Sequence, residues 1–151
     1  EMRSSWDEYF MMLAEDVSTR ATCDRKHVGC ILVKDKRVIS TGFNGSLPGL
    51  PHCDDIGHLM IAGHCKRTVH AEANAVTLAA KHGISVDGAT AYINTFPCDN
   101  CFKILVAAGI KRIVYNDMYT HTTDDLAFSL AKELGIELEQ VRKEKDVPSL
   151  S

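Results

Sequence analysis

The chain has 151 residues, of which 45% are hydrophobic and 25% are charged, as expected for one globular domain with its own core. Its 17 basic and 20 acidic residues give a net charge of −3, which argues against a polynucleotide as the main partner, because such proteins normally carry a basic face. With no apolar run long enough to cross a membrane and no signal-peptide pattern, we expect a cytoplasmic protein without a membrane partner.

The first half of the chain predicts a helix, two strands and a long loop. Apolar residues recur at helical spacing over residues 5–21, which indicates an amphipathic helix. Residues 28–42 predict two strands joined by a short polar turn at Lys34 to Lys36. Residues 44–66 show no periodicity and contain several glycines and prolines, so we expect a long loop, and long loops in compact domains tend to be functional.

The second half alternates helices with strands. We expect helices over about 71–82, 98–109 and 124–134, strands over 89–95, 111–116 and 136–141, and a frayed tail over 142–151. This alternation predicts a mostly parallel sheet of five strands covered by helices. The whole chain, residues 1–151, is therefore expected to form a single α/β domain.

Six cysteines offer the first indication of a site. Without an export signal they are expected to stay reduced, and metal binding then explains them better than disulfides. Two motifs, each placed where a helix is expected to begin, carry the ligand types of zinc: His70-Ala71-Glu72, and "PCDNC" with Cys98 and Cys101. One imidazole and two thiolates leave a fourth tetrahedral position open, as in catalytic rather than structural zinc sites.

Glu72 has a separate role in this interpretation. Zinc lowers the pKa of a bound water to about 7, and a carboxylate beside the metal can carry the protons of the reaction. Each motif alone has an ordinary explanation, a charged helix start for "HAE" and a redox pair or half a structural zinc site for "PCDNC". Together they form the pairing that is typical of zinc deaminases.

The chain resembles the deoxycytidylate (dCMP) deaminase family over nearly its whole length. The resemblance rests on "RKHVGCILVKDKRVISTGFNGSLPGLPHCDD", "HCKRTVHAEANAV", "FPCDNC" and "AGIKRIVY". It implies a cytidine-deaminase-like three-layer fold with a five-stranded mixed sheet, conversion of dCMP to dUMP and ammonia for thymidylate synthesis, and a homohexamer. It also implies activation by dCTP and inhibition by dTTP, with Mg²⁺ on the triphosphate.

The resemblance assigns roles to individual residues. It implies that His70, Cys98 and Cys101 bind the catalytic zinc, that Glu72 moves protons, that Asn44 hydrogen-bonds the sugar, and that the backbone at Ala71 and Phe96 frames the pyrimidine. The "GFNG" stretch, Gly42, Phe43, Asn44 and Gly45, is expected at the regulatory nucleotide site. Phe43 replaces the tyrosine usual in the family, so any contact that its hydroxyl makes is lost here.

The 5′-phosphate requires cations or N–H donors. Arg25, Lys26 and Arg67 are the candidates, and Arg25 ranks first because it lies between the first helix and the strand that leads to the site. Most such side chains are simply solvated, so this is a hypothesis to be tested by the structure.

A second, structural zinc site is also expected. Cys23, Cys53 and Cys65 flank the long loop, and His58, in preference to His64, is the expected fourth ligand. Free cysteines are the alternative, and the resemblance favours the metal because some family members carry an extra zinc in this region.

Two other functions remain open from the sequence. The chain could be another zinc deaminase, acting on a nucleoside or on a base in single-stranded nucleic acid, although the net charge of −3 argues against a polynucleotide. It could also be a non-catalytic, nucleotide-sensing subunit, but a purely structural metal site has no use for the non-ligand carboxylate of Glu72.

Overall fold

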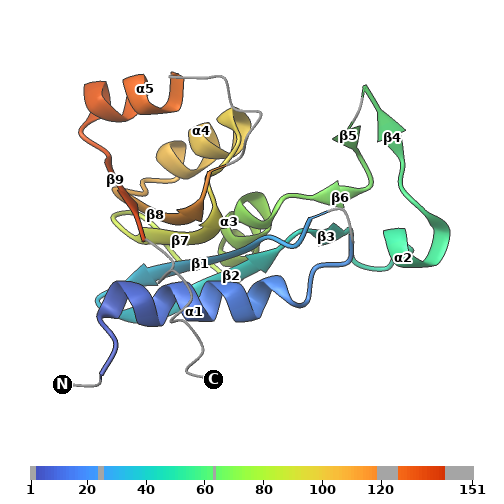
Figure 1. Ribbon diagram of the computed structural model, residues 1–151, viewed down its shortest axis with the longest axis horizontal. Helices are drawn as coiled ribbons and strands as arrows, with labels where there is room; N and C mark the ends of the chain where they lie inside the picture. Colours follow the sequence, from blue (N-terminus) through green and yellow to red (C-terminus); the bar gives the residue numbers. More distant parts are fainter. Residues whose placement is uncertain (1–2, 24–25, 63, 119–125, 142–151) are drawn as a thin grey trace, which may run out of the picture.

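The computed structural model describes residues 3–23, 26–62, 64–118 and 126–141. Figure 1 shows a central sheet with helices on both faces. Residues 47–62 and 64–67 form an arm that projects to one side. In chain order the elements are α1 (Trp6–Ser18), β1 (Gly29–Lys34), β2 (Arg37–Phe43), β3 (Gly45–Ser46), α2 (Cys53–Ile56), β4 (Met60–Ile61), β5 (His64–Cys65), β6 (Thr68–Val69), α3 (Ala71–Lys81), β7 (Thr90–Thr95), α4 (Asp99–Ala107), β8 (Arg112–Asp117), α5 (Leu126–Leu134) and β9 (Glu137–Gln140).

The main sheet has five strands in the order β2-β1-β7-β8-β9. β1 runs antiparallel to both of its neighbours, β2 and β7, whereas β7, β8 and β9 are parallel. The sheet is therefore mixed, with β1 alone reversed, which confirms the expected cytidine-deaminase-like α/β fold. The carboxyl ends of β7, β8 and β9 meet at one edge, where open α/β sheets usually bind their ligands.

Strand alternation divides the core into two layers. Cys30 and Leu32 of β1 belong to a cluster with α3, α4 and α5, while Ile31 and Val33 pack with Phe10 and other apolar residues of α1. Successive side chains of a strand point to opposite faces, so one apolar strand serves both layers. Figure 1 shows the result, with α1 below the sheet and α4 and α5 above it.

Two glycines bring the first strands close to the helices. A Cβ at Gly29 would collide with the backbone of α1 at Ala14 and Ser18, and one at Gly42 would collide with α3 at Ala71 and Ala75. Gly42 therefore lies in β2 for a packing reason. It sets the distance between β2 and the first turn of α3, which carries the candidate catalytic residues.

The expected boundaries needed adjustment at two places. Ser5 caps the start of α1, and its hydroxyl accepts a hydrogen bond from the Glu8 amide at 3.2 Å, but the helix ends at Ser18 rather than residue 21. The segment 44–66 is not one long loop, because β3 pairs with β6 at its base and β4 pairs with β5 farther out. Two-residue strands carry no periodic signal, so the sequence could not reveal them.

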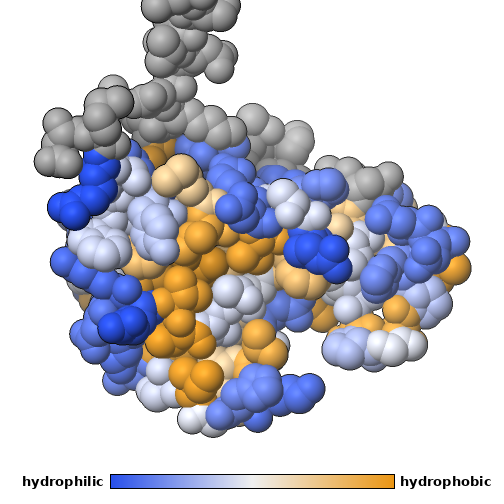
Figure 2. All heavy atoms as spheres, turned by 90° about the horizontal axis from the view of Figure 1, so that it is seen from below, coloured by the Kyte–Doolittle hydropathy of each residue, from blue (hydrophilic) through white to orange (hydrophobic). Residues whose placement is uncertain are grey.

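The projecting arm exposes several large apolar side chains. In Figure 2 apolar surface appears on the arm and as a band across the body. The exposed large apolar residues of the arm are Leu47, Leu50, Ile56, Leu59, Met60 and Ile61. Among the described residues, no helix is both long enough and apolar enough to cross a bilayer.

Candidate metal centre and active site

The structure brings His70, Cys98 and Cys101 together. His70 is the N-cap of α3 and follows β6, while Cys98 is the N-cap of α4 and Cys101 lies in the first turn of that helix. The His70 Nδ1 atom lies 3.6 Å from the Cys98 sulfur and 3.4 Å from the Cys101 sulfur. All three ligand atoms lie within 4.8 Å of one another.

These distances fit zinc. Zinc–sulfur and zinc–nitrogen bonds of about 2.3 and 2.0–2.1 Å at a tetrahedral angle separate the two ligand atoms by about 3.6 Å. The observed separations of 3.6 and 3.4 Å are therefore those of ligands directed at one ion. The donor set, one imidazole and two thiols, is also one that zinc prefers.

The protonation of the cluster favours metal binding. Hydrogen bonding from the Cys101 thiol, supported by His70, lowers the pKa of Cys98 to about 4. The pKa of Cys101 is raised in turn, mainly because its thiol donates to Cys98, and the pKa of His70 is raised by its hydrogen bond with Cys98. The deprotonated sulfur is the form of cysteine that binds zinc, so the lowered pKa of Cys98 favours metal binding.

Glu72 lies beside the cluster, in the first turn of α3, with only 4% of its surface exposed. Burial raises the pKa of its carboxyl, and hydrogen bonding to the Cys101 thiol and the charge of His70 oppose that rise. A buried carboxyl with a raised pKa next to a metal centre is suited to accept and return a proton near neutral pH.

Ala71 and Phe96 lie next to these residues along the chain. Ala71, the first residue of α3, is fully buried. The Phe96 ring packs edge-on against Tyr115 and stacks on Phe128, with centroid separations of 4.9 and 5.0 Å. The Phe96 ring is therefore part of the hydrophobic core.

The residues of the "GFNG" stretch lie in strands. Gly42 and Phe43 end β2, Gly45 begins β3, and Asn44 between them is 8% exposed. The Asn44 side chain accepts a hydrogen bond from the Val28 amide at 2.9 Å and donates one to the Lys26 carbonyl at 2.6 Å. Its observed contacts therefore hold the segment that leads into β1.

The three phosphate candidates differ in position. Arg25 lies outside the described residues, so its role stays a prediction. Arg67 donates from Nε to the Gly57 carbonyl at 3.0 Å, which ties it to the arm. Lys26 instead lines a pocket of about 610 Å³.

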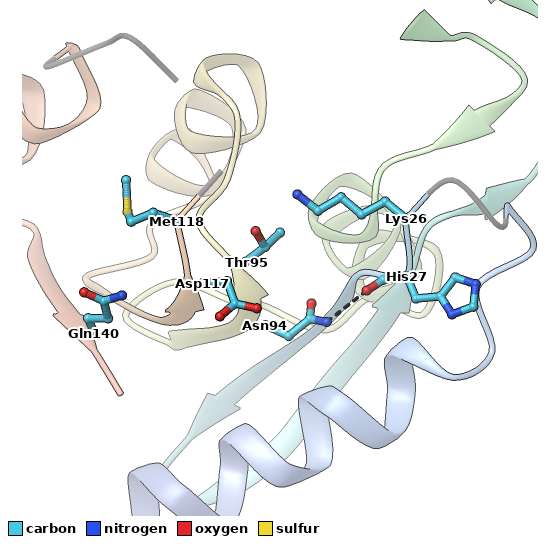
Figure 3. A pocket seen from close by; sticks show the side chains of 7 residues that line it. All are labelled: Lys26, His27, Asn94, Thr95, Asp117, Met118 and Gln140. Atoms are coloured by element: carbon cyan, nitrogen blue, oxygen red, sulfur yellow. Dashed lines mark hydrogen bonds between the residues drawn. The ribbon is translucent and has the colours of Figure 1, made fainter. Parts of the chain in front are cut away.

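That pocket contains residues that the sequence analysis missed. Figure 3 shows Lys26 reaching across it toward Thr95 and Met118. The other lining residues are His27, Asn94, Asp117 and Gln140. Asn94, Asp117 and Gln140 lie at or near the ends of β7, β8 and β9. Because open α/β sheets bind ligands at the carboxyl ends of their strands, this position could have indicated these residues from the sequence.

A second group of possible metal ligands lies at the base of the arm. Cys23, Cys53 and His58 place one ligand atom each within 4.8 Å of the others, and the Cys23 sulfur lies 3.3 Å from the Nδ1 atom of His58. The backbone of Cys65 belongs to β5, but its side chain, like that of His64, is outside the described part of the structure.

Comparison with known proteins identifies the family. Residues 4–117 match the family described as "Cytidine and deoxycytidylate deaminase zinc-binding region". The chain belongs to this family. Its zinc-binding region includes both motifs, so the chain is a zinc-dependent deaminase, and the clustering of His70, Cys98 and Cys101 agrees with that assignment.

Several relatives of this deaminase cover most of its length. It is 42% identical to ComE operon protein 2 of Bacillus subtilis, over 98% of this chain and 77% of that protein. It is 36% identical to the deoxycytidylate deaminase of Saccharomyces cerevisiae, over 92% of this chain and 46% of the yeast protein. The crystal structure of dCMP deaminase from the cyanophage S-TIM5 in complex with dCMP and dUMP matches with a TM-score of 0.79 and 29% identity, over 93% of this chain and all of the phage chain.

Proposed function

We propose that this deaminase converts dCMP and water to dUMP and ammonia, and so supplies a precursor of thymidylate. The observation that carries the proposal is the buried carboxyl of Glu72 beside the three converging metal ligands. The likeness to deoxycytidylate deaminases, one of them solved with dCMP and dUMP, supports the choice of substrate.

In this proposal His70, Cys98 and Cys101 hold a zinc ion, which, when bound, acts as a Lewis acid that makes water nucleophilic at neutral pH. The reaction adds the water oxygen to C4 of the pyrimidine and breaks the bond between C4 and the amino nitrogen. Glu72 takes one proton from the water and delivers it to N3. It then takes the remaining proton from the oxygen added at C4 and delivers it to the amino nitrogen, so that ammonia leaves, the C4 carbonyl of dUMP forms and the carboxylate returns to its initial state.

The remaining site residues position the substrate. The backbones of Ala71 and Phe96 frame the pyrimidine, since both side chains are buried in the protein. One N–H of the Asn44 side-chain amide donates to the Lys26 carbonyl, and one lone pair of its oxygen accepts from the Val28 amide. A primary amide has a second N–H and a second lone pair, and we propose that these contact a sugar hydroxyl.

A structural zinc is proposed at the second cluster, with Cys23, Cys53 and His58 as ligands and Cys65 as the fourth. Cys23 lies after α1, whereas Cys53 and His58 belong to the arm. An ion there would join the arm to the body across 35 residues of sequence, the separation of Cys23 and His58. Such a closed site stabilises the fold directly.

Regulation and assembly are proposed from the family resemblance. We propose a homohexamer that dCTP activates and dTTP inhibits, with Mg²⁺ on the triphosphate, at a site that includes residues 42–45. The exposed apolar side chains of the arm are consistent with contacts between subunits, because monomers rarely expose extended apolar patches. Strictly hyperbolic kinetics in dCMP, unchanged by either triphosphate with Mg²⁺, would contradict the regulatory part.

The substrate proposal is tested by ammonia release from dCMP, deoxycytidine and dCTP, measured side by side on the zinc-loaded protein. We expect dCMP to be preferred by a large factor, because charge-assisted hydrogen bonds to a phosphate are strong. Equal kcat/KM for deoxycytidine and dCMP would instead indicate a nucleoside deaminase. No release from any of the three would favour the nucleotide-sensing alternative.

A further inference from the structure

The side chain of Asn74 joins three parts of the chain at the start of α3. Its amide nitrogen donates to the Phe43 carbonyl at the end of β2, at 2.7 Å, and to the Val69 carbonyl at the end of β6, at 3.3 Å. A primary amide carries two N–H donors, so both are used. Asn74 is half-buried and lies one turn after the metal ligand His70, and the proposed reaction gives it no role.

Each of the two carbonyls belongs to the peptide just before a site residue. Val69 directly precedes His70, and Phe43 directly precedes Asn44. The two peptides lie on neighbouring strands, because β3 pairs with β6, and Figure 1 shows β6 leading from this ladder into α3. Asn74 therefore bridges the backbone of the metal centre and the backbone of the candidate sugar site.

The peptide between Val69 and His70 helps to place the imidazole. His70 is the N-cap of α3, its backbone is extended, and its side chain makes no capping hydrogen bond. Its Nδ1 atom, the ring nitrogen nearer the backbone, lies 3.6 and 3.4 Å from the sulfurs of Cys98 and Cys101, which belong to α4. A rotation of this peptide would move Nδ1 relative to both sulfurs, and the hydrogen bond from Asn74 opposes that rotation.

The peptide between Phe43 and Asn44 is held from both sides. Its N–H, on Asn44, donates to the Val28 carbonyl at 3.3 Å, and its carbonyl, on Phe43, accepts from Asn74. The peptide is thus fixed between the segment that leads into β1 and the first turn of α3. The orientation of the Asn44 side chain, and with it the proposed sugar contact, depends on this peptide.

We propose that Asn74 is a positioning residue that holds the metal ligand His70 and the candidate sugar ligand Asn44 in a fixed relation, through the peptides that precede them. Removing a hydrogen bond behind a metal ligand typically weakens metal affinity or activity by about 10- to 100-fold. The effect at His70 concerns zinc binding and holds for any substrate. The effect at Asn44 rests on the proposed function and refines it.

The test compares two ways of removing the donors with a control that removes a different contact between the same elements. Asn74→Ala deletes both donors and favours a helix, and Asn74→Leu deletes them with little change in side-chain size. Ser40→Ala is the matched control, because the Ser40 hydroxyl also links β2 to α3, by donating to the Ala75 carbonyl at 2.6 Å. That carbonyl precedes neither His70 nor Asn44.

The zinc dissociation constant is the readout that does not require turnover. It is measured by competition with a chelator, below the melting temperature of the metal-free protein, so that every variant is folded. Cys98→Ala lacks one ligand of the His70 cluster, so comparison with it identifies the zinc ion that belongs to that cluster. The KM and kcat for dCMP are then measured at saturating zinc.

Both Asn74 variants should weaken zinc binding at the His70 cluster by about 10-fold. Ser40→Ala should bind zinc as the wild type does, even if it melts at a lower temperature. At saturating zinc the Asn74 variants should raise KM for dCMP by about 2- to 10-fold, the effect of a lost neutral hydrogen bond, with a smaller change in kcat because Glu72 stays in α3.

Wild-type zinc affinity in a folded Asn74 variant would overturn the link to His70, and an unchanged KM would overturn the link to Asn44. An equal loss of zinc affinity in Ser40→Ala would show that the packing of β2 on α3, and not Asn74, determines metal binding. A wild type that does not deaminate dCMP would refute the proposed function, whereas weaker zinc binding by the Asn74 variants alone would still support this inference.

Discussion

Asp7 of α1 and Arg112 of β8, 105 residues apart, form a two-pronged ion pair, with Nη1 to Oδ1 at 2.8 Å and Nη2 to Oδ2 at 2.7 Å. The Tyr92 hydroxyl of β7 donates to the same carboxylate at 2.7 Å. Arg112 also contacts Glu137 and Glu139 of β9. This network joins α1 to the three parallel strands, whose carboxyl ends line the pocket.

Removing the carboxylate charge should weaken the fold. Asp7→Asn is expected to lower the free energy of unfolding by about 1–2 kcal/mol, because the pair is charge-assisted but partly exposed, and so to lower the melting temperature by a few degrees. Asp16→Asn, an exposed acid on the same helix, should cause no such loss. Equal melting temperatures for wild type and Asp7→Asn would contradict the prediction.

The contribution of this pair should depend on pH. The hydrogen bond from Arg112 holds the pKa of Asp7 below its ordinary value of 3.8. A carboxyl whose pKa is lower in the folded state stabilises the protein above the unfolded-state pKa, and this stabilisation is lost as the pH falls through the folded-state pKa. The difference between wild type and Asp7→Asn should thus be constant near neutral pH and shrink below about pH 4.

Glu72→Gln separates proton transfer from metal binding. Glutamine preserves the size of the side chain but cannot accept a proton, so we expect turnover to fall by at least about 100-fold. Zinc content should be unchanged, because the ligand cluster consists of His70, Cys98 and Cys101. Cys98→Ala is the complementary variant and should lose both metal and activity. Near-normal turnover by Glu72→Gln would rule out its assignment as the proton carrier.

Gly42→Ala tests the close approach of β2 to α3. The added methyl group would collide with the backbone of Ala71 and Ala75, so we expect destabilisation of about 1–3 kcal/mol, as for overpacked cores. The collision falls on the first turns of α3, directly after the metal ligand His70, so zinc affinity should also fall. Thr41→Ala, at an exposed position one residue earlier, should change stability by less than about 0.5 kcal/mol. Normal stability and zinc affinity in Gly42→Ala would refute this account of the glycine.

The sequence was sufficient to predict the sheet and the convergence of His70, Cys98 and Cys101 for a physical reason. Apolar runs such as residues 29–34 and the helix starts at His70 and Cys98 are local signals, and parallel strands bring their ends to a common edge. The Asn94 hydrogen bonds to His27 and Gly29 span 67 and 65 residues. Such long-range pairs leave no periodic or spacing signal, so neither they nor the Asp7–Arg112 pair could be predicted from this chain alone.

The last prediction concerns metal content. If Cys23, Cys53 and His58 hold a structural zinc, elemental analysis of the purified protein should find two zinc ions per chain, one for each ligand cluster. Cys53→Ser should reduce the content to one and lower the melting temperature, because an ion that binds only the folded state stabilises it by mass action. Deamination by the remaining zinc should persist at low temperature, since the second cluster contains none of the catalytic ligands. Cys30→Ala, which changes a fully buried cysteine outside both clusters, should retain two zinc ions even if it is less stable. One zinc ion per wild-type chain would mean that the three side chains converge without a metal.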